Sequence, residues 1–390
     1  MRRDEPGTLL GGLTPKSFLR RYWQKRPLLV RGAFPGFLDP LSAGELAGLA
    51  CEDGVESRLV LVRGGARPFH VVPGPQDKRR LRRLPATHWT LLVQGVDRQV
   101  SAVARLRDRF RFVPDWRIDD VMVSFASPFG SVGPHLDSYD VFLIQGRGRR
   151  RWRVQLRPDP ALRAGLDLGV LRRFEADADW VLEAGDMLYV PPGIAHHGVA
   201  LEDSLTYSIG FRAPSHAELL AGALQRRLRG MPASLRYGDP GLGPSRQPGE
   251  IDRTTIARLR RIVARELEGL AGPDLERSLG ELLTETKDAG PLRRSRRLSP
   301  IALGRRLVNG GALVRSDASR IAFVRRRGGT DLFVDGQTLA LPRPLAFAAP
   351  LLTGPPRLDG LALRPHLEAP GFLELVADLV NRGAFELARR

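Results

Sequence analysis

The sequence contains a single cysteine among its 390 residues. Cys51 cannot form an intramolecular disulfide, so the fold does not depend on an oxidising compartment, and a metal site built from several thiolates is excluded. Long apolar runs are missing as well. No run approaches the ~20 residues that cross a bilayer, and no apolar signal segment follows the N-terminal MRRDEPGTLL. We therefore expect a cytoplasmic protein without a membrane segment.

Lysine is also scarce. Only four of the 61 basic residues are lysine and the other 57 are arginine, and the formal net charge is +18. Such a charge favours nucleic-acid binding, because cations gain affinity for phosphate by releasing counterions. The arginine excess, together with abundant alanine, glycine and proline, is also typical of a GC-rich genome. Charge alone therefore assigns no function.

The length predicts two or three domains, at roughly 100 to 200 residues each. Near the start, Thr14 precedes Pro15 as a helix cap, and Phe18, Leu19 and Tyr22 form the apolar face of the helix. Between about residues 119 and 212, short apolar or alternating runs are separated by Gly, Pro and Asp turns. This pattern predicts a β-sandwich or barrel, and we place the first domain at residues 1–213.

The pattern changes twice after the barrel. Residues 214–290 contain three stretches with apolar residues at three- and four-residue spacing, which predicts amphipathic helices. Residues 291–390 contain a helix, the strand-like SRIAFVRRR and TDLFVDGQTLAL with a glycine turn between them, and a closing helix. Helices with a β-hairpin wing predict a small winged-helix-like domain.

The segment GPHLDSYDVFLIQG carries the first candidate site residues. We interpret it as one strand from His135 to about Gln145. Because side chains alternate along a strand, His135, Asp137 and Tyr139 are expected on the inward face. A lone histidine and aspartate two positions apart are more often a hydrogen-bonded structural pair. With suitable companions, however, they are the start of a metal site.

A third ligand is available in AGDMLYVPPGIAHHG, where a strand, a Pro-Pro-Gly turn and a further strand present His196 or His197. Two histidines and one carboxylate on one face of an octahedron leave three positions open, which is the arrangement of non-haem iron(II) oxygenases. Oxygen and a bidentate 2-oxo acid can occupy those positions. The sequence therefore predicts an iron site made from His135, Asp137 and one of the two histidines.

The co-substrate also needs a cation inside the barrel, and Arg150 meets this requirement. In RRRWRV, alternation places Arg150 on the same side as Trp152 and Val154. Those two apolar side chains belong inside, so the guanidinium is buried with them. A buried cation is costly without an anion, and a bidentate pair with a carboxylate removes that cost.

The segments HLDSYDVFLIQGRGRRRWRV, DMLYVPPGIAHHG and SIGFRAP together resemble the Jumonji-type ribosomal oxygenases, in particular those that hydroxylate a ribosomal arginine. The resemblance extends to GGLTPKSFLRRYWQKRPLL and to the closing part of the chain. It implies a mainly β fold with helices: a double-stranded β-helix (the JmjC or cupin barrel), a helical dimerisation region and a C-terminal winged-helix-like domain.

The resemblance also implies an activity. Such enzymes use iron(II), 2-oxoglutarate and O₂ to hydroxylate the β-carbon of an arginine in the sixteenth protein of the large ribosomal subunit. By this resemblance His135, Asp137 and His196 match the iron ligands, Arg150 matches the residue that binds 2-oxoglutarate, and Ser124 is a weaker candidate for the same carboxylate. A homodimer formed through residues of about 215–290 is implied as well.

A substrate arginine needs acceptors at the mouth of the barrel, and Asp120 and Tyr139 are the candidates. Asp119 and Asp140 are alternatives that the sequence does not separate from them.

Two other functions stay open: the same chemistry on a histidine of another ribosomal protein, and a non-catalytic ribosome- or RNA-binding module. For the second, residues 291–327 hold eleven arginines and one acidic residue, Asp317, which allows a contact with ribosomal RNA.

Overall fold

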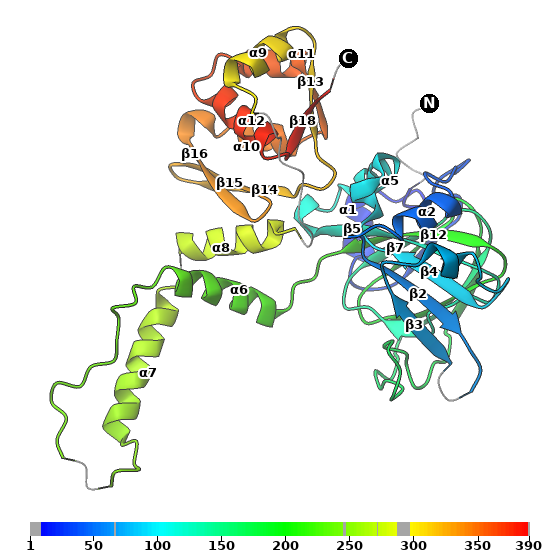
Figure 1. Cartoon of the computed structure of the whole chain (residues 1–390), viewed down its shortest axis with the longest axis horizontal. Helices are drawn as coiled ribbons and strands as arrows, with labels where there is room; N and C mark the ends of the chain where they lie inside the picture. The colour runs from blue at the N-terminus through cyan, green and yellow to red at the C-terminus, as the bar shows by residue number, and fades with distance from the viewer. Residues whose placement is uncertain (1–8, 66–67, 245–246, 271, 287–296, 389–390) are drawn as a thin grey trace. The chain divides into compact units, whose positions relative to one another are not determined.

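The computed structural model describes residues 9–65, 68–244, 247–270, 272–286 and 297–388. The chain divides into two units, residues 1–213 and 214–390, and Figure 1 labels many of their helices and strands. Across the described ranges, no helix has both the length and the apolar character needed to span a membrane.

The described part of the first unit contains two antiparallel sheets. The eight-stranded sheet has the order β1-β10-β7-β12-β5-β4-β2-β3, and the four-stranded sheet has the order β6-β11-β8-β9. The larger sheet consists of β1 (Leu28–Val30), β2 (Ser57–Val62), β3 (Phe69–Pro73), β4 (Trp89–Val93), β5 (Ile118–Ala126), β7 (Val141–Gln145), β10 (Met187–Val190) and β12 (Ser204–Phe211). The smaller consists of β6 (His135–Leu136), β8 (Arg150–Gln155), β9 (Ala178–Leu182) and β11 (Ala195–Ala200).

Short helices accompany the larger sheet: α1 (Pro15–Arg21), α2 (Ala43–Leu49), α3 (Lys78–Leu81), α4 (Val96–Gln99) and α5 (Ser101–Arg107). The predicted first helix is confirmed. Thr14 accepts a hydrogen bond from the Ser17 amide at 3.2 Å, proline occupies the first turn, where its missing N–H is not needed, and Phe18 is fully buried. The strand predicted at PLLV is also present, as β1.

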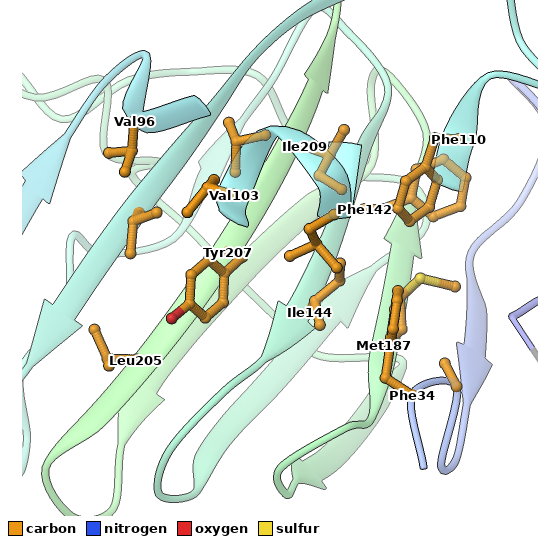
Figure 2. Packing of buried hydrophobic residues seen from close by; sticks show 14 of the residues in the cluster. Phe34, Val96, Val103, Phe110, Phe142, Ile144, Met187, Leu205, Tyr207 and Ile209 are labelled. Carbon is orange, nitrogen blue, oxygen red and sulfur yellow. The ribbon is translucent and has the colours of Figure 1, made fainter. Parts of the chain in front are cut away.

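The outer face of the larger sheet carries the main hydrophobic core. Side chains of β7, β10 and β12 pack there against residues of α4, α5 and the segment that follows them, as Figure 2 shows. The labelled members are Phe34, Val96, Val103, Phe110, Phe142, Ile144, Met187, Leu205, Tyr207 and Ile209. Burial of this face holds the strands rigidly, so their opposite face can carry functional side chains.

The inner face of the same strands packs against the smaller sheet through a second apolar cluster, whose buried members are Val141, Leu143, Trp152, Val154, Leu182, Leu188 and Val190. β7 and β10 are therefore buried on both faces. This explains their uninterrupted apolar runs, VFLI and MLYV, because a strand covered on both sides has no solvated positions that would be polar.

The prediction of one continuous strand from His135 to Gln145 is wrong. The chain leaves β6 after Leu136 and re-enters a strand only at Val141. β6 pairs with β11 in the smaller sheet, whereas β7 pairs with β10 and β12 in the larger one. The intervening bend is held by hydrogen bonds from the Gly193 amide to the Asp137 carbonyl and from the Phe211 amide to the Asp140 carbonyl. The chain thus crosses between the sheets at the candidate site.

The second unit combines helices with two three-stranded sheets, β17-β13-β18 and β14-β15-β16. Its helices are α6 (His216–Arg229), α7 (Arg253–Glu268), α8 (Pro273–Thr284), α9 (Pro300–Val308), α10 (Ala348–Thr353), α11 (Gly360–Leu363) and α12 (Phe372–Asn381). Its strands are β13 (Ala312–Arg315), β14 (Ile321–Arg326), β15 (Gly329–Val334), β16 (Gln337–Pro342), β17 (Arg357–Asp359) and β18 (Phe385–Ala388).

The expected division near residue 290 stays a prediction, and residues 287–296 lie outside the described residues. Helix α8 contacts α6 and also the sheet β14-β15-β16. Arg277 of α8 pairs with the buried Asp331 at 2.9 Å, and Thr338 donates to Glu281 at 2.5 Å. Packing therefore joins the end of the helical region to the strands that follow.

The two-stranded wing predicted from SRIAFVRRR and TDLFVDGQTLAL is a three-stranded meander. The second stretch is divided between β15 and β16. Asp335 and Gly336 connect them with φ values of 50° and 76°. Two successive residues with positive φ form the two-residue turn that matches the twist of a hairpin, and Asp-Gly is a preferred sequence for it. This turn signal was present in the sequence and was missed.

Candidate active site

The three predicted metal ligands come together where the smaller sheet ends. His135 of β6 and His196 of β11 are register partners, and their ring centroids lie 4.2 Å apart. Asp137 follows β6, with its carboxylate oxygens 3.6 Å from His196 Nε2 and 4.0 Å from His135 Nε2. One ligand atom from each of the three lies within 4.8 Å of the others. This donor set could hold one divalent cation and leave further coordination positions open.

Backbone carbonyls orient both imidazoles. His135 Nδ1 lies 3.0 Å from the carbonyl oxygen of Gly133, and His196 Nδ1 lies 3.4 Å from that of Ile194. When each Nδ1 carries the proton, each Nε2 is free to act as a ligand. Burial lowers the pKa of His196 to about 4, and the nearby His135 adds to this effect. The imidazole of His196 is therefore neutral near pH 7, as metal binding requires.

The neighbouring His197 faces the other way, because adjacent side chains of a strand point to opposite faces. Its Nε2 lies 3.1 Å from Ser131 Oγ, and its Nδ1 lies 2.8 Å from the Arg153 guanidinium. Burial and the charge of Arg153 lower its pKa to about 4. The structure thus separates the two histidines that the sequence left as alternatives, and His196 is the one beside Asp137.

Arg150 is buried on the inner face of β8, as the predicted alternation requires. Arg150, Trp152 and Val154 are 5%, 6% and 0% exposed, whereas Arg151 between them is exposed. Val154 pairs with His196 across the sheet. The guanidinium and the metal ligands therefore lie on one inner surface, four strand positions apart.

The partners of Arg150 among the described residues are neutral. One terminal nitrogen donates to Ser124 Oγ at 3.0 Å and the other to Ser204 Oγ at 3.2 Å. No described carboxylate pairs with it, and burial lowers its pKa to about 10. A buried cation surrounded by hydroxyl groups is an incomplete anion site. The carboxylate of a 2-oxo dicarboxylic acid fits this site.

The sequence pattern missed Ser204 and Thr90 as parts of this pocket. Ser204 of β12 is fully buried against Arg150. Thr90 of β4 shares the inner face with Ser124, because its register partner is Ala126, two positions along β5. The Thr90 hydroxyl is buried without a hydrogen-bond partner among the described residues. Ser204 begins the alternation of small polar and apolar residues in SLTYSIGF, and this alternation could have identified it; TLLV gives no such signal for Thr90.

Asp120 and Tyr139 flank Gly210 of β12. A Cβ atom placed on Gly210 would lie 3.7 Å from Asp120 Oδ1 and 3.9 Å from Tyr139 Cε2. Burial raises the pKa of Asp120 to about 6, with further contributions from Asp119 and Asp97. Burial also raises the pKa of the Tyr139 hydroxyl, as do the nearby charges of Asp137 and Asp120. This acidic, partly covered wall is suited to a cationic ligand.

The two alternative carboxylates already have partners. Asp119 pairs with Arg212 at 3.3 Å. Asp140 is fully buried and accepts hydrogen bonds from Tyr189 at 2.5 Å and Gln24 at 3.1 Å. Asp120 receives the Gly95 amide at 2.8 Å and forms no salt bridge with a described residue. The structure therefore favours Asp120 over Asp119 and Asp140.

Comparison with known proteins agrees with this geometry. Residues 105–219 match the model of the JmjC domain. The chain is 40% identical over 381 residues to the Escherichia coli ribosomal protein uL16 3-hydroxylase, covering 94% of this chain and 95% of that protein. The chain belongs to the JmjC ribosomal oxygenases. A probable ribosomal oxygenase of Haemophilus influenzae is 38% identical over 218 residues, which cover 54% of this chain and 52% of that protein.

Solved structures of this JmjC oxygenase family resemble the whole chain. The X-ray structure of E. coli YcfD has a TM-score of 0.83 with 36% identity, and the match covers 96% of this chain and 98% of that one. A second YcfD structure, in complex with cobalt and 2-oxoglutarate, has a TM-score of 0.80 with 38% identity and the same coverage. The chain thus has a mixed α/β structure, and its first unit has the cupin-like JmjC fold.

Proposed function

We propose that this JmjC oxygenase uses iron(II), 2-oxoglutarate and O₂ to hydroxylate the β-carbon of an arginine in ribosomal protein uL16. The observation that carries the proposal is the placement of His135, Asp137 and His196 on the same inner surface as Arg150, a buried cation without an anion. The E. coli relative is named for this substrate, and E. coli YcfD binds cobalt and 2-oxoglutarate.

The residues then have separate roles. His135, Asp137 and His196 would hold the iron through two imidazole nitrogens and one carboxylate oxygen, while Arg150 and Ser124 bind the far carboxylate of 2-oxoglutarate. Iron(II) held there would activate O₂, and the four electrons that reduce O₂ would come in pairs from the oxidative decarboxylation of 2-oxoglutarate and from the substrate C–H bond. One oxygen atom would enter succinate as CO₂ leaves, and the other would become the hydroxyl group on the substrate. The apolar cluster between the two sheets, which includes Trp152 and Val154, borders this space.

Asp120 and Tyr139 are the proposed contacts for the substrate arginine. The Asp120 carboxylate lies near the charge of Arg98 but forms no salt bridge with a described residue, so a guanidinium can pair with it. Tyr139 is 40% exposed and lies beside the bend that carries Asp137. Both residues border the same glycine, Gly210, which has no side chain to stand between them and an incoming guanidinium.

The activity is tested by loading the chain with iron(II) without oxygen, then adding 2-oxoglutarate, a uL16 fragment and O₂. We expect succinate together with one added oxygen atom on an arginine of the fragment. Hydroxylation of a histidine in another ribosomal protein would identify the related substrate class instead. Absence of succinate with every ribosomal substrate, together with RNA binding that survives His135→Ala, would support the non-catalytic module.

The homodimer and the winged-helix-like module are also proposals. The helix α7 has no buried residue, and its exposed Ile256, Leu259, Val263 and Leu267 recur at three- and four-residue spacing on one face. We infer that a second copy of the chain covers this face and that the following residues form a winged-helix-like module. Light scattering should report a dimer that Val263→Asp weakens and Arg261→Asp, on the other face, does not.

A contact of the arginine-rich residues 291–327 with ribosomal RNA is retained as a proposal. Three of these arginines, at 293, 294 and 296, lie outside the described residues. Binding of the chain to ribosomal RNA fragments should decrease with salt in proportion to the number of phosphates contacted. Binding that does not change with salt would contradict this contact.

A further inference from the structure

Trp152 lies between the two halves of the candidate site. It occupies β8 between Arg150 and Val154, and all three are buried on the inner face. Its ring centroid is 5.9 Å from that of His196. A dicarboxylic acid that spans from the metal ligands to Arg150 must therefore pass along the Trp152 side chain.

The indole N–H of Trp152 is buried and has no hydrogen-bond partner among the described residues. A buried donor without an acceptor costs about 1–3 kcal/mol, and buried polar groups are almost always paired. The Ser124 and Ser204 hydroxyls of the same inner face accept hydrogen bonds from Arg150 instead. The described residues therefore supply no acceptor for the indole N–H, and a bound ligand could supply one.

The position of the ring is fixed by Gly198, the register partner of Trp152 on β11. A Cβ atom on Gly198 would lie only 2.8 Å from Cη2 and Cζ3 of the indole. Gly198 is not among the glycines with positive φ, so its backbone does not require glycine. The missing side chain instead provides the space that the indole occupies, and the strand pair holds the donor at one depth in the barrel.

We propose that the indole N–H of Trp152 donates a hydrogen bond to an oxygen of the 2-oxo dicarboxylic acid bound between the metal ligands and Arg150. The inference rests on the proposed function, because it takes 2-oxoglutarate as the occupant of this space. Trp152 is then a binding residue for the co-substrate, and Gly198 positions it.

Nuclear magnetic resonance can observe this hydrogen bond directly. The full chain is labelled with ¹⁵N-tryptophan, loaded with zinc(II) so that no turnover occurs, and titrated with 2-oxoglutarate. The chain has five tryptophans, and the signal that disappears in Trp152→Phe is the one to follow. We expect this indole N–H signal to move downfield and to saturate with the co-substrate.

Trp180 provides a matched control because it is the register partner of Trp152 on β9 and packs against the same apolar cluster. We expect Trp152→Phe to weaken 2-oxoglutarate binding by about tenfold, the equivalent of one net hydrogen bond, and Trp180→Phe to change it less than threefold. If Trp152→Phe folds poorly, single Phe replacements of the other four tryptophans assign the Trp152 signal by elimination, and the wild-type titration then answers the question.

The outcomes are distinguishable. Saturable binding of 2-oxoglutarate by the wild-type chain with an unmoved Trp152 signal, or equal affinities of the two variants, would overturn the inference and leave the proposed function intact. A wild-type, zinc-loaded chain that does not bind 2-oxoglutarate would overturn the proposed function and this inference with it.

Discussion

Replacement of Arg150 by methionine should separate the stability of the chain from its affinity for the co-substrate. Arg150 is 5% exposed, and its described partners are two hydroxyls and a carbonyl. Burial lowers its pKa to about 10, which corresponds to roughly 3 kcal/mol at about 1.4 kcal/mol per pKa unit. Because the folded-state pKa lies below the unfolded one, this penalty is complete at any pH below about 10.

The magnitudes favour opposite effects with and without ligand. Methionine removes the desolvation penalty and also the hydrogen bonds to Ser124 and Ser204, worth about 1 kcal/mol each. The ligand-free variant should therefore be about 1 kcal/mol more stable than the wild type. Loss of the charged hydrogen bonds to a carboxylate should cost about 3 kcal/mol of binding free energy, so the Kd for 2-oxoglutarate should rise roughly a hundredfold.

Calorimetric melting with manganese(II) in the absence of oxygen measures both the stability of the ligand-free chain and the stabilisation by 2-oxoglutarate. At 2-oxoglutarate a hundred times above the wild-type Kd, the ligand should stabilise the wild type by about 2.7 kcal/mol and the variant by about 0.4 kcal/mol. For a unit of this size the wild-type Tm should rise by roughly 5 to 10 °C and that of the variant by about 1 °C. Arg151→Met is the control, because Arg151 is exposed and pairs with Asp179.

A large loss of stability in the ligand-free Arg150→Met variant, combined with an unchanged Kd for 2-oxoglutarate, would refute the reasoning. Arg150 would then be a structural core residue whose hydroxyl partners satisfy its charge. A similar loss of affinity in Arg151→Met would point to a non-specific effect of removing positive charge.

Three further predictions concern the metal ligands, Asp120 and Gly198. His135→Ala should lower manganese(II) affinity by more than a hundredfold in calorimetry, whereas His197→Ala should lower it less than tenfold, since His197 binds Ser131 and Arg153 instead; equal losses would contradict this assignment. The Asp120 pKa is about 6, so KM for an arginine peptide should rise as pH falls from 7.5 to 5.5. Asp120→Asn should give a high KM that does not change over this range, and a profile with the wild-type slope would exclude Asp120 as the acceptor. In Gly198→Ala the new Cβ would lie 2.8 Å from the Trp152 ring. This variant should have a free energy of unfolding lower by about 1–3 kcal/mol and should bind 2-oxoglutarate more weakly. A fully stable Gly198→Ala variant with unchanged binding would show that the ring has room to move.

The sequence predicted most of the local structure around the site. The helix at Thr14, the alternation in RRRWRV and the helices between residues 214 and 290 are set by neighbouring residues, so short-range patterns are enough to identify them. The convergence of His135, Asp137 and His196 was expected from the resemblance to a family, and the structure brings these side chains together. Their role as ligands stays a prediction.

The sequence did not predict how the chain crosses between the sheets. In HLDSYDVFLIQ every second residue fits one continuous strand, and nothing local shows that β6 ends after two residues and that β7 belongs to the other sheet. That division depends on partners about fifty residues away in β10 and β11. The choice among Asp119, Asp120 and Asp140 was open for the same reason, because it depends on Arg212 and Tyr189, which are distant in sequence.

The two-residue ladder between β6 and β11 has a consequence for the intact enzyme. Only the pairs Ala195–Leu136 and His196–His135 join these strands, and so short a pairing is weak by itself. An ion held by both imidazoles would add a cross-link between segments some sixty residues apart, at the end of the smaller sheet beside the proposed co-substrate site. Loss of the ion would then loosen this end of the sheet as well as stop turnover. The metal-free enzyme would therefore bind 2-oxoglutarate less tightly than the loss of the metal–ligand bonds alone would explain.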